Sequence, residues 1–267
     1  MRPRVLIPNG YGLNCEDETA YSFTLAGARA DKVHLSDIFA KPALLEEYQI
    51  LAMIGGFSFG DHIAAGKVLA NRYKYLLSKE LAEFIDAGKL IIGVCNGFQS
   101  MIEYGLLPGF DGDYNTQLTS LAPNSSGVFE DRWVTLKANP NSPCVFTKGI
   151  DTVPLPVRHG EGRFIPMHEG VLAELWSKRQ VALQYVNPST GKPTQRYPLN
   201  PNGSVDAIAG VCDPTGRVFG MMPHPEAYNS PHNHPDWIQR RSEGALPAEG
   251  LGLRIFRNAV EYVRNSF

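Results

Sequence analysis

The run from Gly93 to Gln99 constrains the fold of this chain more than any other part of the sequence. It reads Gly-Val-Cys-Asn-Gly-Phe-Gln and follows directly after the apolar residues 90–92. A nucleophile that stands two residues from a glycine on either side is typical of a sharp strand-to-helix turn in an α/β sheet. Glycine is needed on both sides because the turn is strained and other atoms come close to its backbone. The pattern therefore predicts that Cys95 occupies such a turn and that its thiol acts as a nucleophile.

The helix expected after Cys95 adds a second feature. Backbone N–H groups in the first turn of a helix have no partner within the helix, so they can hold an oxyanion beside the nucleophile. The competing interpretation is a buried cysteine in a tight turn, because free cysteine is among the most buried residue types. Two glycines at these offsets after a strand favour the reactive thiol.

The first half of the chain predicts a mostly parallel sheet. Short apolar runs alternate there with helical patterns, as expected when helices cover both faces of a sheet. Apolar residues of the segment 77–85 recur on one face of a helix, and Gly88 stands where a left-handed cap is expected. The predicted strands are residues 5–7, 32–35, 50–54 and 89–94.

The second half of the chain predicts shorter, more antiparallel strands. Clusters of Gly, Pro, Asn and Ser separate its apolar runs. The segment 228–250 shows little periodicity, so we expect an irregular surface excursion there, followed by a final helix over residues 255–263. We therefore expect one α/β domain over residues 1–267. The predicted strands are residues 133–136, 181–185, 207–211 and 218–222.

Composition and charge exclude several classes of protein. Of the 267 residues, 43% are hydrophobic and 19% are charged, which is ordinary for a globular protein. The formal net charge of −2 lacks the basic excess of a general nucleic-acid binder. No apolar run is long enough to span a membrane, and residues 1–8 lack the apolar core of a signal peptide. We expect a cytosolic protein with no nucleic-acid and no membrane partner.

No pattern in the sequence indicates a metal site. The cysteines form no Cys-x-x-Cys pair, so neither a zinc site nor a disulfide framework is indicated, and the three besides Cys95 are interpreted as packing residues. His232, His234 and Asp236 lie in a proline-rich loop without a supporting ligand pattern, which favours solvated loop residues over metal ligands. The four cysteines are Cys15, Cys95, Cys144 and Cys212.

A base for Cys95 is predicted in the run Pro223-His224-Pro225-Glu226, at the end of a predicted strand. A thiol nucleophile needs a base, and that base needs an orienting partner. In an extended segment His224 and Glu226 lie on the same side, so Glu226 could bind one imidazole nitrogen while the other faces Cys95. Taken alone, the His-x-Glu pattern favours a histidine that merely caps a turn. Together with the cysteine turn, the sequence favours a Cys95–His224–Glu226 triad.

Two glycine-rich segments are further candidates. Residues 55–61, Gly-Gly-Phe-Ser-Phe-Gly-Asp, follow a predicted strand and could aim backbone N–H groups at an anion, or could form a simple turn. Residues 159–164, His-Gly-Glu-Gly-Arg-Phe, place charges between glycines. Gly160, Gly162 and Arg163 could therefore bind a zwitterionic substrate or belong to a polar hairpin, and both interpretations stay open.

The motifs together resemble those of class I, triad-type glutamine amidotransferases. More narrowly, the chain is similar to the glutaminase subunits of phosphoribosylformylglycinamidine synthase, which act in purine biosynthesis. The resemblance extends from residue 14 to residue 226. It rests on residues 14–19, 55–61, 93–99, 159–164, 200–204, 208–210 and 220–226.

This resemblance implies a flavodoxin-like three-layer sandwich that hydrolyses glutamine. Cys95 would attack the side-chain amide to form a glutamyl thioester, His224 would carry the proton, and Glu226 would orient His224. The backbone N–H groups of the oxyanion hole would come from Gly56, Phe57 and Asn96. Gln99 stands in the position that helps to bind glutamine in this superfamily.

The resemblance also implies a partner. Ammonia would pass to a synthetase subunit that uses ATP and Mg to convert formylglycinamide ribonucleotide to its amidine, with a small accessory subunit as a further possible member of the complex. We expect no cofactor and no metal in this chain. The alternatives are a triad amidotransferase that serves a different acceptor, and a non-catalytic regulatory subunit on the same fold.

Overall fold

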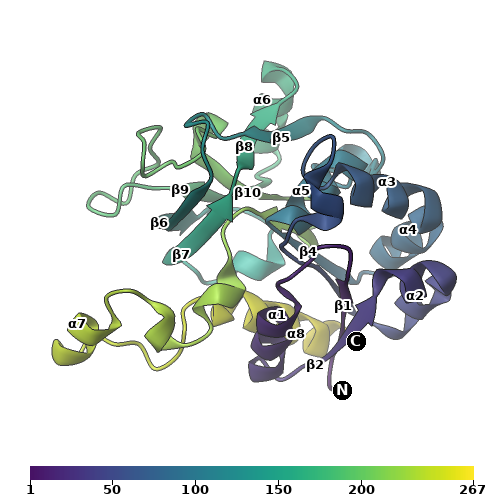
Figure 1. The fold of residues 1–267 in the computed structure, drawn as a ribbon, viewed down its shortest axis with the longest axis horizontal. Coiled ribbons are helices and arrows are strands. Elements are labelled where there is room, and N and C mark those ends of the chain that lie inside the picture. The colour runs from purple at the N-terminus through teal and green to yellow at the C-terminus, as the bar shows by residue number, and fades with distance from the viewer.

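The computed structural model describes residues 1–267, in which nine strands form one sheet (Figure 1). Five neighbouring strands are parallel, and β11, late in the chain, lies directly beside β4. In sheet order these are β2 (Arg29–His34), β1 (Arg4–Asn9), β3 (Ile50–Met53), β4 (Leu90–Val94) and β11 (Val218–Met221). The sheet continues with antiparallel neighbours, β10 (Ile208–Cys212), β9 (Val181–Tyr185), β6 (Glu130–Ala138) and β7 (Thr152–His159).

Helices cover both faces of the parallel half of the sheet, which gives the expected three-layer α/β sandwich (Figure 1). On one face α1 (Glu16–Leu25) packs against α8 (Leu253–Ser266), and on the other α3 (Lys67–Leu76) packs against α5 (Asn96–Tyr104). No helix in the structure combines the length and the apolar character that a membrane-spanning segment needs. The remaining α-helices are α2 (Leu35–Ala40), α4 (Ser78–Asp86), α6 (Glu169–Ser177) and α7 (Trp237–Ser242).

The central strands are buried because both of their faces meet helices. Every residue of β3, β4 and β11 is buried. Their continuous apolar sequences are those expected of parallel strands that are covered on both sides. The final helix also matches its prediction, because the apolar stripe of α8 is buried and Phe256 contacts the ring of Phe23 edge-on, with 4.9 Å between ring centroids. The helices α1 and α8 thus pack against each other over one face of the sheet that carries the site.

Several boundaries differ from the sequence prediction. Strand β2 ends at His34, and Leu35 already begins α2. A second sheet of two strands, β5 (Thr119–Pro123) and β8 (Glu161–Pro166), was not predicted, because β5 is short and its apolar residues are few.

The segment 228–250, expected to be an irregular surface excursion, is irregular only in part. The segment begins at the last residue of one short 3-10 helix, Pro225–Tyr228. It contains a second 3-10 helix, Pro231–Asn233, and the helix α7, which extends away from the sheet (Figure 1). No residue of α7 is buried, so this helix has no apolar stripe by which the sequence could indicate it.

Candidate active site

The predicted strand-to-helix turn at Cys95 is present. Strand β4 ends at Val94 and α5 begins at Asn96, with Cys95 between them at φ 50° and ψ −107°. A non-glycine residue with positive φ is strained, and such strain is concentrated at functional sites. The thiol is almost fully buried and lies 3.5 Å from the carbonyl oxygen of Arg158, to which it donates. Cys95 is therefore held in one orientation at the end of a central strand.

Both glycines of the turn are required by close contacts. A Cβ on Gly97 would lie 2.0 Å from the carbonyl oxygen of Met53 at the end of β3. A Cβ on Gly93 would lie 2.3 Å from the sulfur of Met101 in α5. These distances are far below van der Waals contact, so the helix after Cys95 can reach its position only because these side chains are missing.

Strand pairing brings His224 to the cysteine. Val94 of β4 is in register with Met221 of β11, so the two strands end side by side and the residues beyond them meet. The backbone N–H of His224 donates to the carbonyl of Pro156, 2.8 Å away, which fixes the turn after β11. The carboxyl ends of parallel strands are the usual place for a site in α/β proteins.

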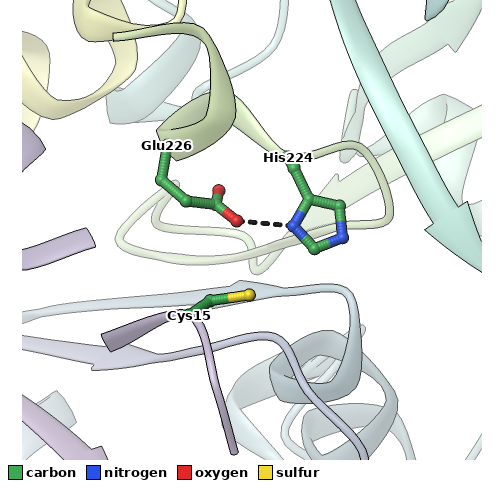
Figure 2. A group of neighbouring side chains, drawn as sticks. All are labelled: Cys15, His224 and Glu226. Carbon is green, nitrogen blue, oxygen red and sulfur yellow. Dashed lines mark hydrogen bonds and ion pairs between the residues drawn. The ribbon is translucent and has the colours of Figure 1, made fainter. Parts of the chain in front are cut away.

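His224 and Glu226 form a buried pair (Figure 2). Nδ1 of His224 lies 2.5 Å from Oε1 of Glu226, and both side chains are almost completely buried. The other ring nitrogen, Nε2, is buried and has no hydrogen-bond partner in the structure. The carboxylate thus orients the imidazole and leaves Nε2 available for chemistry.

The charges around His224 favour its protonated form. Burial by itself lowers the pKa of the imidazole, but the negative charge of Glu226 and the sulfur of Cys95 outweigh burial and raise the pKa of His224 well above its usual value. The arrangement is suited to nucleophilic attack followed by proton transfer from His224.

A cleft opens beside the thiol, and an acidic and a basic residue lie in its lining. These are Glu18 and Arg158, whose side chains form no ion pair and no side-chain hydrogen bond. The sequence assigned neither residue a role, although Glu18 belongs to the segment 14–19 on which the family resemblance rests. The cleft is lined by Asn14, Cys15, Glu18, Gly56, Phe57, Cys95, Phe129, Arg158 and His224.

The predicted oxyanion donors are only partly available. The N–H of Gly56 has no hydrogen-bond partner, and that of Asn96 is the first of a helix and has no intrahelical acceptor. The N–H of Phe57, in contrast, donates to the carbonyl of Gly12, 2.9 Å away. The expectation for Phe57 is therefore not met in this structure, because the turn at residues 10–13 pairs with the loop. Its ring lines the cleft instead.

The comparisons with known proteins agree with this geometry. A family model described as a CobB/CobQ-like glutamine amidotransferase domain matches residues 2–263. The chain is 43% identical over 267 residues to the phosphoribosylformylglycinamidine synthase subunit PurQ of Methanococcus maripaludis, with 97% of each chain covered. It is 45% identical over 261 residues to PurQ of Dehalococcoides mccartyi, with 98% of each covered. This chain belongs to the PurQ family of glutamine amidotransferases.

A solved structure supports the same assignment. A chain in the structure of PurLQS from Thermotoga maritima is 29% identical to this chain and superposes with a TM-score of 0.71. The match covers 98% of this chain and 100% of that chain. The family membership therefore holds at the level of the whole fold as well as of the motifs.

Gln99 is not among the residues that line the cleft. Its amide nitrogen donates to the carbonyl of Glu161, 2.6 Å away, and its oxygen accepts from the side chain of Asn96. The Asn96 amide also donates to Asp61, 3.0 Å away, and accepts from the N–H of Ser58. These bonds join the residue 55–61 loop, the turn at Cys95 and strand β8, so both side chains stiffen the site. A direct contact of Gln99 with glutamine stays a prediction.

The segment 159–164 forms the turn between β7 and β8. Its backbone is held by the buried Asn200–Ser204 loop, in which Asn202 donates to the carbonyl of Gly162, 2.8 Å away, and Ser204 accepts from the N–H of Phe164. Gly160, Gly162 and Arg163 are not among the residues that line the cleft. The segment is not a hairpin, because β7 pairs with β6 and β8 pairs with β5, so the turn joins two different sheets. A role of these three residues in substrate binding stays a prediction.

One further expectation concerns the possible metal ligands of the loop at residues 232–236. His234 is buried, accepts from the N–H of Asp236 and contacts Arg240, while the ring of His232 packs on Trp237.

Cys15, in contrast, was interpreted as a packing residue, and the structure places it in the cleft beside His224 (Figure 2). In the sequence, the only indication that Cys15 lies at the site was its place in the segment 14–19, on which the family resemblance rests.

Proposed function

We propose that Cys95, His224 and Glu226 hydrolyse glutamine and supply the ammonia to a phosphoribosylformylglycinamidine synthase. The observation that carries this proposal is the buried His224–Glu226 pair beside Cys95 at a strained strand-to-helix turn, in a chain of the PurQ family. Neither alternative acceptors nor a purely regulatory role has a specific observation in its favour.

The reaction follows from the positions of the three side chains. The Cys95 thiolate attacks the side-chain amide carbon of glutamine, and the developing oxyanion is held by the N–H groups of Gly56 and Asn96. His224 then donates its proton to the leaving nitrogen, which departs as ammonia and leaves a glutamyl thioester on Cys95. Water, deprotonated by the now neutral His224, hydrolyses the thioester to glutamate. Glu226 keeps the imidazole oriented in both halves of the reaction.

Recognition of glutamine is assigned to the two unpaired charges of the cleft. A free amino acid carries an α-ammonium and an α-carboxylate, and Glu18 and Arg158 supply one opposite charge for each. Charge-assisted hydrogen bonds are about twice as strong as neutral ones, so the pair selects a zwitterion over neutral amides.

The ammonia acceptor lies on another subunit. The relatives are named as subunits of phosphoribosylformylglycinamidine synthase, and the structural neighbour is a chain in the structure of PurLQS. In our proposal the synthetase subunit uses ATP and Mg to form the amidine, a small accessory subunit completes the complex, and this chain needs no cofactor of its own. In this proposal, glutamine hydrolysis and amidine formation take place in the cytosol.

The test is amidine formation with the matching synthetase subunits, formylglycinamide ribonucleotide and ATP. We expect the wild-type chain to support the reaction with glutamine, and Cys95→Ala to support it only when ammonium is added. Glutamine use by Cys95→Ala at the wild-type rate would contradict the assignment of Cys95. Glutamine hydrolysis without amidine formation would keep the glutaminase and overturn the acceptor.

A further inference from the structure

Cys15 is a buried thiol within the cleft that the proposed reaction does not use. It stands immediately before α1, and 6% of its surface is exposed. A Cβ built on Gly55 would lie 3.0 Å from its sulfur and 2.9 Å from Cε1 of His224, so thiol and imidazole approach the same glycine. The tertiary fold brings them together, because Cys15 and His224 are 209 positions apart in the sequence.

Cys15, His224 and Glu226 together present a mixed set of metal ligands. The thiol sulfur, one imidazole nitrogen and one carboxylate oxygen all lie within 4.8 Å of one another (Figure 2). All three side chains are buried, and Nε2 of His224 and Oε2 of Glu226 have no hydrogen-bond partner. Sulfur, nitrogen and oxygen in one such group are the donors that zinc takes, in tetrahedral geometry.

We propose that Cys15, His224 and Glu226 form a site for a thiophilic divalent cation, with Zn²⁺ as its natural ligand, and that occupation of this site switches the glutaminase off. Zinc bonds to the sulfur at about 2.3 Å and to nitrogen or oxygen at about 2.0–2.2 Å. A tetrahedral ion would therefore hold its ligands roughly 3.3–3.6 Å apart. The group needs to contract by about 1 Å at its widest to enclose the ion, and the hydrogen bond between His224 and Glu226 has to break, because both side chains become ligands.

The binding step is a ligand exchange without any redox change. The hydrated cation loses water molecules and gains bonds to sulfur, nitrogen and oxygen, while the Cys15 thiol and the imidazolium release their protons to solvent. One coordination position is left for water or for the neighbouring Cys95. Because the cleft is lined by both Cys15 and His224, the ion has an entry path from solvent.

Inhibition follows from the shared residues and rests on the proposed function. His224 cannot carry a proton between Cys95 and the leaving ammonia while it is bound to the cation. Glu226 cannot orient the imidazole while its carboxylate is a ligand. The alternative is a weaker site made by Cys95 and His224 alone, of the kind that any cysteine–histidine pair could provide. The experiment has to distinguish this pair from the site at Cys15, His224 and Glu226.

The experiment uses the full chain with Cys95→Ala, so that the catalytic thiol cannot be a ligand. Titration with Co²⁺ is expected to produce a thiolate-to-cobalt charge-transfer band in the near ultraviolet, and added Zn²⁺ is expected to remove it. In the Cys95→Ala, Cys15→Ala double variant the band is expected to be absent. Cys144→Ala, which removes a buried thiol outside the cleft, serves as the matched control and is expected to keep the band.

Each outcome decides the proposal. A band that persists without Cys15, or that Cys95→Ala alone abolishes, overturns it, the second result pointing to the Cys95–His224 pair. Cys15→Ser serves as a second variant if Cys15→Ala fails to fold. Glu226→Gln is expected to weaken Co²⁺ binding roughly 10- to 100-fold. Co²⁺ binding is measured in a chain that lacks the catalytic thiol, so an absence of binding would leave the glutaminase assignment intact. The glutaminase assignment is tested separately with metal-free wild type.

Discussion

At the scale of single residues, the site depends first on a glycine at a position where any side chain would clash. Gly97 allows α5 to approach the end of β3, and a methyl group there would meet the backbone oxygen of Met53 at 2.0 Å. We expect Gly97→Ala to lower the free energy of unfolding by about 1–3 kcal/mol and to abolish glutamine hydrolysis, because overpacking displaces the turn at Cys95. Urea unfolding and a glutaminase assay measure the two effects.

A matched control for this prediction lies in the β7–β8 turn. A Cβ on Gly160 would approach only the ring of Phe129, at 3.9 Å, which is ordinary contact. Gly160→Ala is expected to change the free energy of unfolding by less than about 0.5 kcal/mol. Equal losses in both variants would show that the crowding at Gly97 is not the cause.

A second prediction at this scale concerns the charges of the cleft. Glu18→Gln removes the carboxylate assigned to the α-ammonium of glutamine, so we expect KM for glutamine to rise roughly 10- to 100-fold with little change in kcat. Glutaramic acid, which lacks the α-amino group, is expected to be hydrolysed equally well by wild type and variant. If the variant loses activity toward both amides to the same degree, Glu18 does not bind the ammonium.

At the scale of secondary-structure elements, α8 is held by one buried side chain as well as by its apolar stripe. Asn258 donates from Nδ2 to the carbonyls of Phe146 and Lys148, each at 2.8 Å. Asn258→Ala removes both bonds and leaves two carbonyl groups without this donor. We expect a loss of about 1–3 kcal/mol in the free energy of unfolding.

The same helix supplies the control for this element. Asn265 is exposed near the end of α8, and Asn265→Ala is expected to be neutral within about 0.5 kcal/mol. Thermal or urea unfolding of the two variants measures the difference. A neutral Asn258→Ala would mean that the packing of Phe256 and its apolar neighbours alone holds the helix.

At the scale of the whole molecule, one buried histidine links stability to pH. Nδ1 of His159 lies 3.0 Å from Oδ1 of Asn124, whose nitrogen already donates to two carbonyls, so His159 must be the donor. Burial, and then the positive charge of His224, lower the pKa of His159 to about 3. The native imidazole therefore stays neutral where the unfolded one, with a pKa of about 6.5, takes up a proton.

The sign of this linkage is fixed by the two pKa values. The contribution of neutral His159 is fully present above about pH 6.5 and is lost as the pH falls toward 3, with a slope of up to about 1.4 kcal/mol per pH unit. We expect His159→Gln to flatten the fall in stability over this range, and His232→Gln, on the exposed segment, to leave it unchanged. Urea unfolding at several pH values tests this, and an unchanged slope in His159→Gln would contradict it.

Much of the fold and part of the site could be predicted because they depend on local patterns. The apolar runs of β3 and β4 reveal strands buried on both faces, and the two glycines around Cys95 reveal a strained turn, since backbone conformation and periodicity are properties of a few consecutive residues. Segments without such patterns were missed. Strand β5 is short, and α7 buries no side chain, so neither leaves a periodic signal.

The sequence by itself determined the turn at Cys95, the pairing of His224 with Glu226 and the family, because each is encoded by residues close together in the chain. Only the tertiary structure decided that β11 lies beside β4, and hence which residues surround the thiol. Cys15, Glu18 and Arg158 enter the cleft, and the N–H of Phe57 is taken by Gly12, through contacts between segments far apart in the chain. Strand order and register set those contacts, and no local pattern specifies them.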